Sequence, residues 1–176
     1  DGHQTIAAVD GMADQSILVD TFSKTYKMTG FRIGWCVANE ELITTMDIFQ
    51  QNSVTNVPAF VQYAALAALT GPQDYVEETR KVLQAKRDKT VAALNSMDGI
   101  ECQAPDGSFY VFPDIRGTGM TSQQFSDYFI EEHGVAVVAG TAFGDQGEGH
   151  IRLTYAVPDD MLEEGLERIQ QGLENL

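Results

Sequence analysis

The chain has 176 residues, of which 43% are hydrophobic, so it can bury a core of ordinary size as one domain or one and a half. Its 26 acidic and 11 basic residues give a formal net charge of −15, which argues against nucleic-acid binding because phosphates would be repelled. No apolar run reaches the length of a membrane span, and residues 1–20 lack the pattern of a secretory signal. We therefore expect a cytoplasmic protein that enters no membrane.

The acidity itself has two interpretations. A salty cytoplasm would screen such self-repulsion and point to a halophilic source, whereas the chain could equally be an ordinary acidic protein. Stability measured from low to molar salt separates the two. The two cysteines, Cys36 and Cys102, lie far apart and are expected to be buried free thiols, and the three scattered histidines predict no metal site.

The first 72 residues alternate short apolar runs with helical patterns. Residues 16–20 form an apolar run ahead of a polar turn and predict a buried strand. Residues 31–38 mix β-branched and aromatic side chains and predict a second strand. A helix is expected over about 40–50, and a buried helix rich in alanine and leucine over 58–69, ahead of a break at 70–72.

A long charged stretch follows, and its single apolar stripe predicts an amphipathic helix over 73–97. The remaining pattern predicts strands over 108–113, 135–140 and 150–155, and helices over 121–134 and 158–176.

The change of rhythm at the long helix predicts the domain organisation. Residues 1–71 are interpreted as the C-terminal part of a larger α/β domain, because they hold too few strands to complete a sheet. Residues 72–98 are interpreted as a connecting helix and residues 99–176 as a small α+β domain with its own sheet. This interpretation implies that further sequence lies upstream.

The segment 21–35 carries the clearest chemistry. A predicted strand ends in a hydroxyl-rich turn that presents Lys24, and eight residues later Arg32 stands between two glycines. Hydroxyls and an arginine around a lysine suit a dianionic phosphate held beside an amine. The glycines allow close approach of a phosphate or a tightly packed cofactor. By spacing alone, two ordinary surface cations are an equally good interpretation.

The run SKTYKMTGFRIGW (residues 23–35) resembles the lysine signature of the class I aminotransferases, which are fold type I pyridoxal-phosphate enzymes. The resemblance implies that Lys24 bonds covalently to pyridoxal phosphate and that Arg32 pairs with the cofactor phosphate. It implies hydroxyl contacts from Thr21 and Ser23, although Thr21 stands where the family usually has glycine or serine. Lys27 is a second departure, but the register of the arginine assigns the covalent role to Lys24.

A second run, GHIRLTYA (residues 149–156), resembles the family's C-terminal strand, whose arginine binds the substrate α-carboxylate. The resemblance assigns that role to Arg152, whose fork can meet both carboxylate oxygens. For any single arginine, an outward position on a strand would be the default. The resemblance also makes Phe143 a candidate pocket residue, with core packing as the favoured alternative. Thr55 and Asn56 stand where family members contribute to a neighbouring subunit's pocket.

The resemblance implies a fold: the C-terminal part of a large cofactor-binding domain, a connecting helix and a small domain. It implies an enzyme that moves an amino group between an amino acid, such as aspartate or an aromatic amino acid, and a 2-oxo acid, and that works as a homodimer. The family's aspartate and tyrosine that hold the cofactor ring have no counterpart here, so the chain alone could be inactive. Fold type I lyase chemistry and a non-catalytic ligand-binding module remain the alternatives.

Overall fold

The structure of the protein is a computed structural model that describes residues 2–176. The chain divides into two compact units, Asp1–Glu77 and Glu78–Leu176, each described here by itself. Every helix and strand predicted from the sequence is present within the described residues, although several are shorter than predicted.

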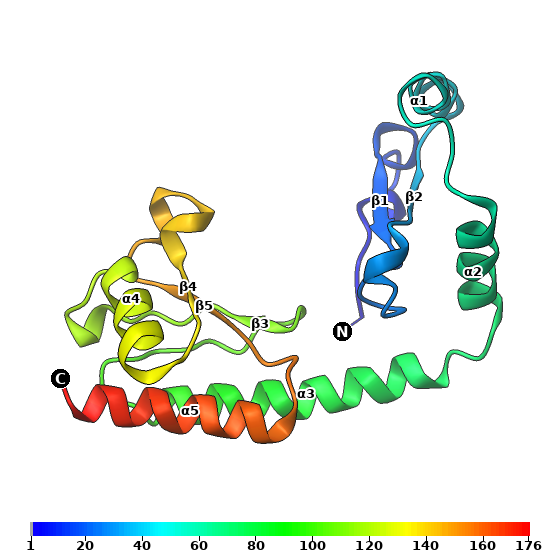
Figure 1. Ribbon diagram of the computed structural model, residues 1–176. Coiled ribbons are helices and arrows are strands. Elements are labelled where there is room, and N and C mark those ends of the chain that lie inside the picture. Colours follow the sequence, from blue (N-terminus) through cyan, green and yellow to red (C-terminus); the bar gives the residue numbers. More distant parts are fainter. Residues whose placement is uncertain (1) are drawn as a thin grey trace. The chain divides into compact units, whose positions relative to one another are not determined.

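The first unit contains a two-stranded antiparallel ribbon and two helices (Figure 1). Strand β1 (Leu18–Thr21) pairs with β2 (Gly34–Val37), so that Leu18 lies opposite Val37 and Thr21 opposite Gly34. Helix α1 (Glu40–Ser53) begins after Asn39, whose side-chain oxygen accepts a hydrogen bond from the Leu42 amide at 3.0 Å. Helix α2 (Ala59–Thr70) follows Pro58. Short 3-10 turns lie at Ile6–Ala8, Ala13–Gln15 and Thr29–Phe31.

The core of this unit is small. Phe22 and Met28, from the loop that joins the two strands, pack with Ala65 of α2. Tyr26, at the edge of this cluster, donates a hydrogen bond to the Gln73 side chain at 3.3 Å and contacts the ring of Tyr75. The loop is therefore fixed at its base by both apolar and polar contacts.

Three predictions of burial in this unit are wrong. The apolar strand at β1 is exposed, with Val19 75% accessible, and α2 buries only Val61 and Ala65 while Phe60 is 72% exposed. Cys36, expected to be a buried thiol, is exposed as well. The reason is geometrical: two strands and two helices cannot cover both faces of the ribbon and every side of an apolar helix.

The second unit contains a three-stranded antiparallel sheet with the order β3-β5-β4. Its strands are β3 (Tyr110–Val111), β4 (Val138–Ala139) and β5 (Ile151–Thr154). Its helices are α4 (Ser122–His133) and α5 (Asp159–Glu174), together with most of α3 (Asp74–Asn95), which begins in the first unit. Short 3-10 turns lie at Arg116–Thr118, Gly140–Phe143 and Asp145–Gly147.

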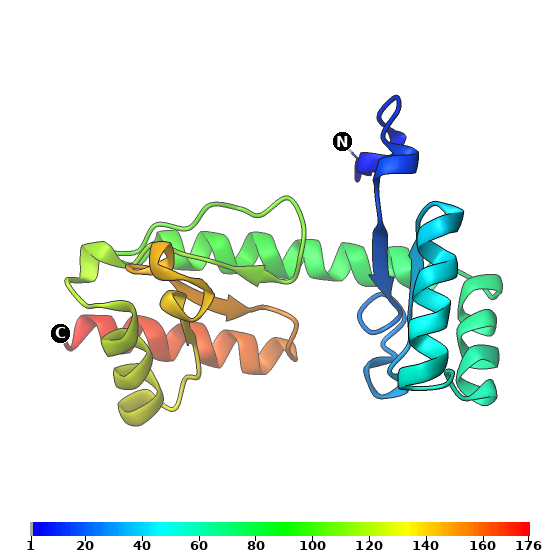
Figure 2. The ribbon, with the colours of Figure 1, turned by 90° about the horizontal axis from the view of Figure 1, so that it is seen from above.

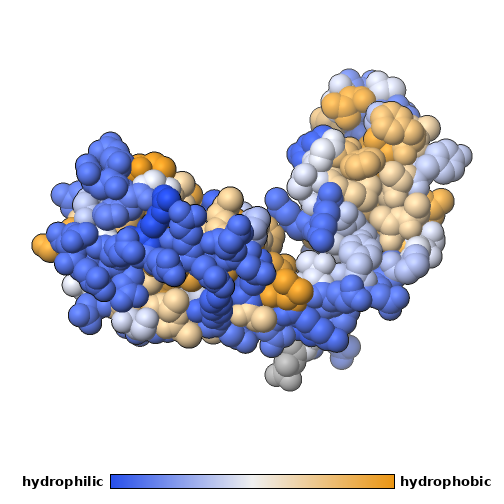
Figure 3. All heavy atoms as spheres, turned by 60° about the horizontal axis from the view of Figure 1, so that its bottom comes forward, coloured by the Kyte–Doolittle hydropathy of each residue, from blue (hydrophilic) through white to orange (hydrophobic). Residues whose placement is uncertain are grey.

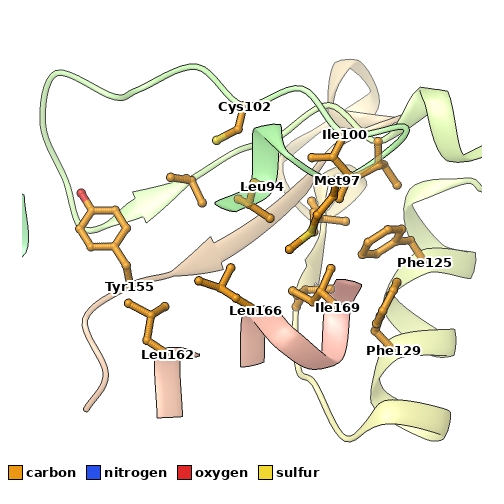
Figure 4. Close-up of a cluster of buried hydrophobic side chains, with 14 residues drawn as sticks. Leu94, Met97, Ile100, Cys102, Phe125, Phe129, Tyr155, Leu162, Leu166 and Ile169 are labelled. Carbon is orange, nitrogen blue, oxygen red and sulfur yellow. The ribbon is translucent and has the colours of Figure 1, made fainter. Parts of the chain in front are cut away.

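One face of this sheet and the three helices enclose a continuous core (Figure 4). Phe125 and Phe129 of α4 and Ile169 of α5 are completely buried in it. Helix α4 begins with a capping box, in which Thr121 and Gln124 each bond the other's backbone amide. The unit therefore closes a core from its own residues.

Helices α3 and α5 run alongside each other beneath this sheet (Figures 1 and 2). Lys86 of α3 forms an ion pair with Asp159 at 2.8 Å, and Lys89 pairs with Glu163 one turn further along. The hydrogen bond from Lys86 lowers the pKa of the Asp159 carboxyl. Among residues 2–176, no helix is long and apolar enough to cross a membrane.

Candidate functional site

The loop between β1 and β2, residues 22–33, carries most of the candidate site residues of the first unit. Its ends are held together by the hydrogen bond from the Phe22 amide to the Ile33 carbonyl, at 3.2 Å. A Cβ on Gly34 would lie 2.6 Å from the Asp20 carbonyl oxygen, so glycine is needed there for the two strands to approach. The close approach of the protein's own two strands therefore explains why position 34 is glycine, and no bound group is needed to explain it.

Lys24 lies in the exposed turn at the start of this loop. The turn is closed by hydrogen bonds from the Tyr26 amide to the Phe22 carbonyl and from the Lys27 amide to the Lys24 carbonyl, both at 3.2 Å. Lys27 has a backbone φ of +53°, a conformation that non-glycine residues rarely adopt. Because Phe22 is buried directly before the turn, the backbone at Lys24 is anchored while its side chain is exposed.

Arg32 lies at the other end of the loop in a left-handed conformation, with φ +51° and ψ +50°. Such a conformation costs a non-glycine residue about 1–2 kcal/mol and is found most often at functional sites. The Arg32 Nη1 donates a hydrogen bond to the Thr29 carbonyl at 3.0 Å, and the side chain is otherwise exposed.

Gly30 differs from Gly34. A Cβ built on Gly30 would meet no protein atom within 4 Å, and its φ is not positive. Nothing in the described residues therefore requires glycine at this position, and the space beside it is open to a bound group. A phosphate that approaches the backbone at Gly30, two residues before Arg32, would meet no side chain of that residue.

The remaining candidates of the first unit are polar and accessible. Thr21 ends β1, is exposed, and its amide donates to the Asp20 carboxylate at 2.6 Å, whereas Ser23 is half-buried. Thr55 and Asn56 are exposed in the connection between α1 and α2, and Thr55 has a φ of +67°. The structure therefore gathers Thr21, Ser23, Lys24 and Arg32 on one loop and its flanking strand, while Thr55 and Asn56 lie on a separate connection.

Arg152 is the candidate substrate-binding residue of the second unit. It lies on the central strand β5 opposite Val138, half-buried on the face of the sheet away from the core. Its Cζ lies over the ring of Tyr110, 4.4 Å from the centroid, and over the ring of Phe143, at 4.6 Å. Within residues 2–176 its guanidinium has no hydrogen bond or ion pair, so its donors are available to a ligand.

The favoured core role for Phe143 is wrong, since its side chain is 52% exposed. It follows β4 in a 3-10 turn that lies outside the sheet, where it reaches Arg152 rather than the core. Phe112 contacts the Phe143 ring edge-on at 6.0 Å and stacks on His150 at 5.2 Å. These rings form a partly exposed aromatic surface beside Arg152.

Arg116, another arginine of the second unit, is already paired with a carboxylate. Arg116 donates through Nε to both oxygens of Asp114, at 3.0 and 2.9 Å, and its Nη2 also bonds the same carboxylate. These hydrogen bonds hold the pKa of Asp114 at about 2. Arg116 is thereby neutralised, which distinguishes it from Arg152.

Tyr110 is the residue that sequence reasoning missed. It stands in the run 108–113, which predicts a strand and assigns no role in a site to Tyr110. The signal available was the alternation along the strand, which places Tyr110 on the opposite face from the buried Val111. Only the pairing of β3 with β5 brings that face beside Arg152.

No group of three or more histidine, cysteine, aspartate or glutamate side chains in residues 2–176 could hold a metal ion. The chemistry on offer is therefore an exposed amine, a strained arginine and hydroxyls in the first unit, and an aromatic-flanked arginine in the second.

Comparison with known proteins gives consistent matches. A family model described as aminotransferase class I and II matches residues 2–169. An aspartate aminotransferase of Pyrococcus horikoshii is 42% identical over 163 residues, which are 92% of this chain and 42% of that protein. The aromatic-amino-acid aminotransferase 2 of Thermococcus litoralis is 40% identical over 96% of this chain and 44% of its own length.

A solved structure of an aromatic aminotransferase from Pyrococcus horikoshii superposes with a TM-score of 0.95 at 42% identity, covering 99% of this chain and 47% of that one. The chain thus spans less than half the length of the relatives it matches.

Proposed function

The chain belongs to the class I and II aminotransferase family, and we propose that it supplies the cofactor lysine and the substrate arginine of an enzyme that moves an amino group between an amino acid and a 2-oxo acid. The relatives named above act on aspartate or aromatic amino acids according to their names, so these are the substrates we propose first. The observation that carries the proposal is the loop 22–33, which carries Lys24 in an anchored turn and, at its other end, a strained Arg32 two residues after the open position at Gly30.

Pyridoxal phosphate is the cofactor of this family, and the loop has the groups to hold it. Lys24 Nζ would bond its aldehyde carbon, and Arg32 would pair with its phosphate. The hydroxyls of Thr21 and Ser23 would donate hydrogen bonds to the same phosphate. When bound, the cofactor supplies an electron-accepting ring that makes the α-proton of an amino acid removable.

Arg152 would receive the α-carboxylate of the substrate. A guanidinium fork fits both carboxylate oxygens, and the accessible donors of Arg152 have no acceptor within the described residues. The amino group of the substrate would take the place of Lys24 Nζ on the aldehyde carbon. The released Nζ would then move a proton from the substrate α-carbon to that carbon, and the second half of the cycle would run these steps in reverse. Phe143, Thr55 and Asn56 are proposed to contact the substrate or a neighbouring subunit.

The test is amino-group transfer from aspartate and from phenylalanine to 2-oxoglutarate, measured with the complete natural protein. Lys24→Ala should abolish transfer, and Arg152→Leu should raise KM for the amino acid and lower kcat/KM by about 100-fold or more. Ammonia or pyruvate released without an acceptor would instead identify a lyase. Ligand binding without turnover would identify a non-catalytic module.

We further propose that this chain acts together with polypeptide that covers its first unit. Val19, Trp35, Phe49, Phe60 and Tyr63 are exposed there, and Figure 3 shows orange and pale-orange atoms across the face of this unit that is in view. Surfaces of this kind mark interfaces. The matched relatives are more than twice as long as this chain, which supports the same proposal.

The 176-residue chain by itself should therefore transaminate at least about 100-fold more slowly than the complete protein, because the groups that hold the cofactor ring have no counterpart in it. Normal turnover by this chain without a partner would refute this. We also propose a cytoplasmic homodimer. Light scattering of the complete protein at micromolar concentration tests the dimer, and cell fractionation tests the location.

A further inference from the structure

Arg152 poses a physical problem for the proposed function. An arginine side chain has about 2 kcal/mol of rotamer entropy, and a carboxylate is bound well only when the fork points at it. No hydrogen bond or ion pair among the described residues fixes the guanidinium. Among these residues, the guanidinium contacts aromatic rings.

Two aromatic rings provide that contact. The guanidinium carbon lies over Tyr110 at 4.4 Å and over Phe143 at 4.6 Å, both within the range of a cation–π interaction. Such contacts restrict the position of the cation without using its N–H donors in ordinary hydrogen bonds. The donors therefore stay available for a carboxylate.

Tyr110 is held in place by the sheet. It pairs with Thr154 across β3 and β5, which makes it the diagonal neighbour of Arg152 on the same face. The Tyr155 hydroxyl donates to the Ser108 carbonyl at 2.8 Å, and the Tyr155 amide donates to the Phe109 carbonyl at 3.1 Å. These two bonds attach the residues before Tyr110 to the end of β5, and Val111, directly after it, pairs with Leu153.

Phe143 is held by a contact between two glycines. A Cβ on Gly140 would overlap the Gly147 carbonyl oxygen, and a Cβ on Gly147 would overlap the Gly140 carbonyl, so the two 3-10 turns pack backbone against backbone. The Gly140 amide also donates to the His150 carbonyl at 2.8 Å. The turn that ends in Phe143 is therefore fixed to the start of β5.

We propose that Tyr110 and Phe143 form an aromatic clamp that orients the Arg152 guanidinium to receive a substrate carboxylate. The two rings are positioning residues, which act through Arg152. The inference rests on the role proposed for Arg152 and goes beyond it, because it names the described side chains that orient the guanidinium. Preorganisation of this kind raises affinity by lowering the cost of ordering the side chain.

The test measures binding of 3-phenylpropanoate and of its uncharged amide to the complete protein by calorimetry. Tyr110→Phe keeps the ring and should leave carboxylate affinity within about twofold of wild type. Tyr110→Leu and Phe143→Leu should each weaken it about five- to thirty-fold, the range expected for a partly buried cation–π contact. Binding of the amide should change less than about twofold in all three variants.

Phe112→Leu is the matched control. It removes a ring two residues after Tyr110 that contacts the rings of Phe143 and His150, but this ring is not one of the two that lie over the Arg152 guanidinium, and leucine can keep an apolar contact with Phe143. Its carboxylate affinity should stay within about twofold of wild type. Steady-state kinetics should agree with the binding data: Tyr110→Leu should raise KM for the amino acid far more than it lowers kcat.

The outcomes separate the two proposals. If Arg152→Leu weakens carboxylate binding but Tyr110→Leu and Phe143→Leu do not, the clamp is wrong and the role of Arg152 stands. Equal losses for carboxylate and amide in Tyr110→Leu would also overturn the clamp, because they would indicate a merely structural role. If Arg152→Leu binds the carboxylate as wild type does, the proposed substrate role and the clamp both fail.

Discussion

The two units of this chain use similar residue types with opposite results. The second unit packs its apolar side chains from α3, α4, α5 and the sheet into one closed core. The first unit buries Phe22, Met28 and Ala65 together but leaves Phe49 and Phe60 exposed. The difference indicates that an apolar pattern predicts burial correctly only where enough elements are present to cover it.

The largest expected effect separates the two units directly. Phe125→Ala empties a site that is completely buried in the second unit and should cost about 3–5 kcal/mol of unfolding free energy. Phe60→Ala removes a ring that is 72% exposed in the first unit and should cost less than about 0.5 kcal/mol in this chain. Urea unfolding followed by circular dichroism measures both.

The cost of Phe60→Ala can also be measured in the complete protein and compared with its cost in this chain. If other polypeptide covers α2 there, the cost of Phe60→Ala should rise above about 2 kcal/mol, as for a buried ring. An unchanged small cost would show that this face stays exposed and would contradict the proposed interface.

A smaller effect concerns two glycines of the same helix, α5. A Cβ on Gly172 would lie 2.5 Å from Phe129 and 2.9 Å from His133, so Gly172→Ala should destabilise the second unit by about 1–3 kcal/mol. Gly165 has open space at that position, and Gly165→Ala should stabilise the helix by up to about 1 kcal/mol. Thermal unfolding distinguishes the two, and the same sign for both would show that the packing of α4 on α5 is looser than described.

The smallest expected effect is pH-dependent and lies in the second unit. Arg116 holds the pKa of Asp114 at about 2, below the value of about 4 in an unfolded chain. A depressed pKa stabilises the fold above pH 4 and loses that contribution as the pH falls toward 2. Asp114→Asn should therefore destabilise the fold slightly at pH 7, as expected for a pair whose arginine is largely exposed, and progressively less below pH 4.

Unfolding of wild type and Asp114→Asn at pH 7 and pH 3 measures this dependence. A difference that is the same at both pH values would mean that the carboxylate charge contributes nothing.

The sequence predicted the positions of the helices and strands because periodicity and breakers are local. Thus 73–97 became α3 at Asp74–Asn95, and 121–134 became α4 at Ser122–His133. Strands were predicted too long: 108–113 contains only Tyr110–Val111 as a strand, because β pairing depends on a partner that lies far away in the sequence.

For the candidate site, the sequence motifs place residues on loops and strands, and the roles assigned to those residues stay predictions. Lys24 and Arg32 were identified by their register, and the loop 22–33 that carries both lies between paired strands. The contact between Tyr110 and Arg152 could not be predicted from the sequence, because it depends on which face of β3 lies beside Arg152. The exposure of β1 and α2 could not be predicted from the sequence, because hydrophobicity does not reveal whether other elements of the chain cover a given segment.

The central claim is that Lys24 carries the cofactor, and an absorbance scan tests it most directly. With pyridoxal phosphate added, the complete protein should show an absorption band from the bound cofactor that differs from free pyridoxal phosphate, and this band should be absent in Lys24→Ala. Lys27→Gln, which removes the other lysine of the same loop, should keep it. A band that survives Lys24→Ala, or one that is lost in Lys27→Gln instead, would contradict the account.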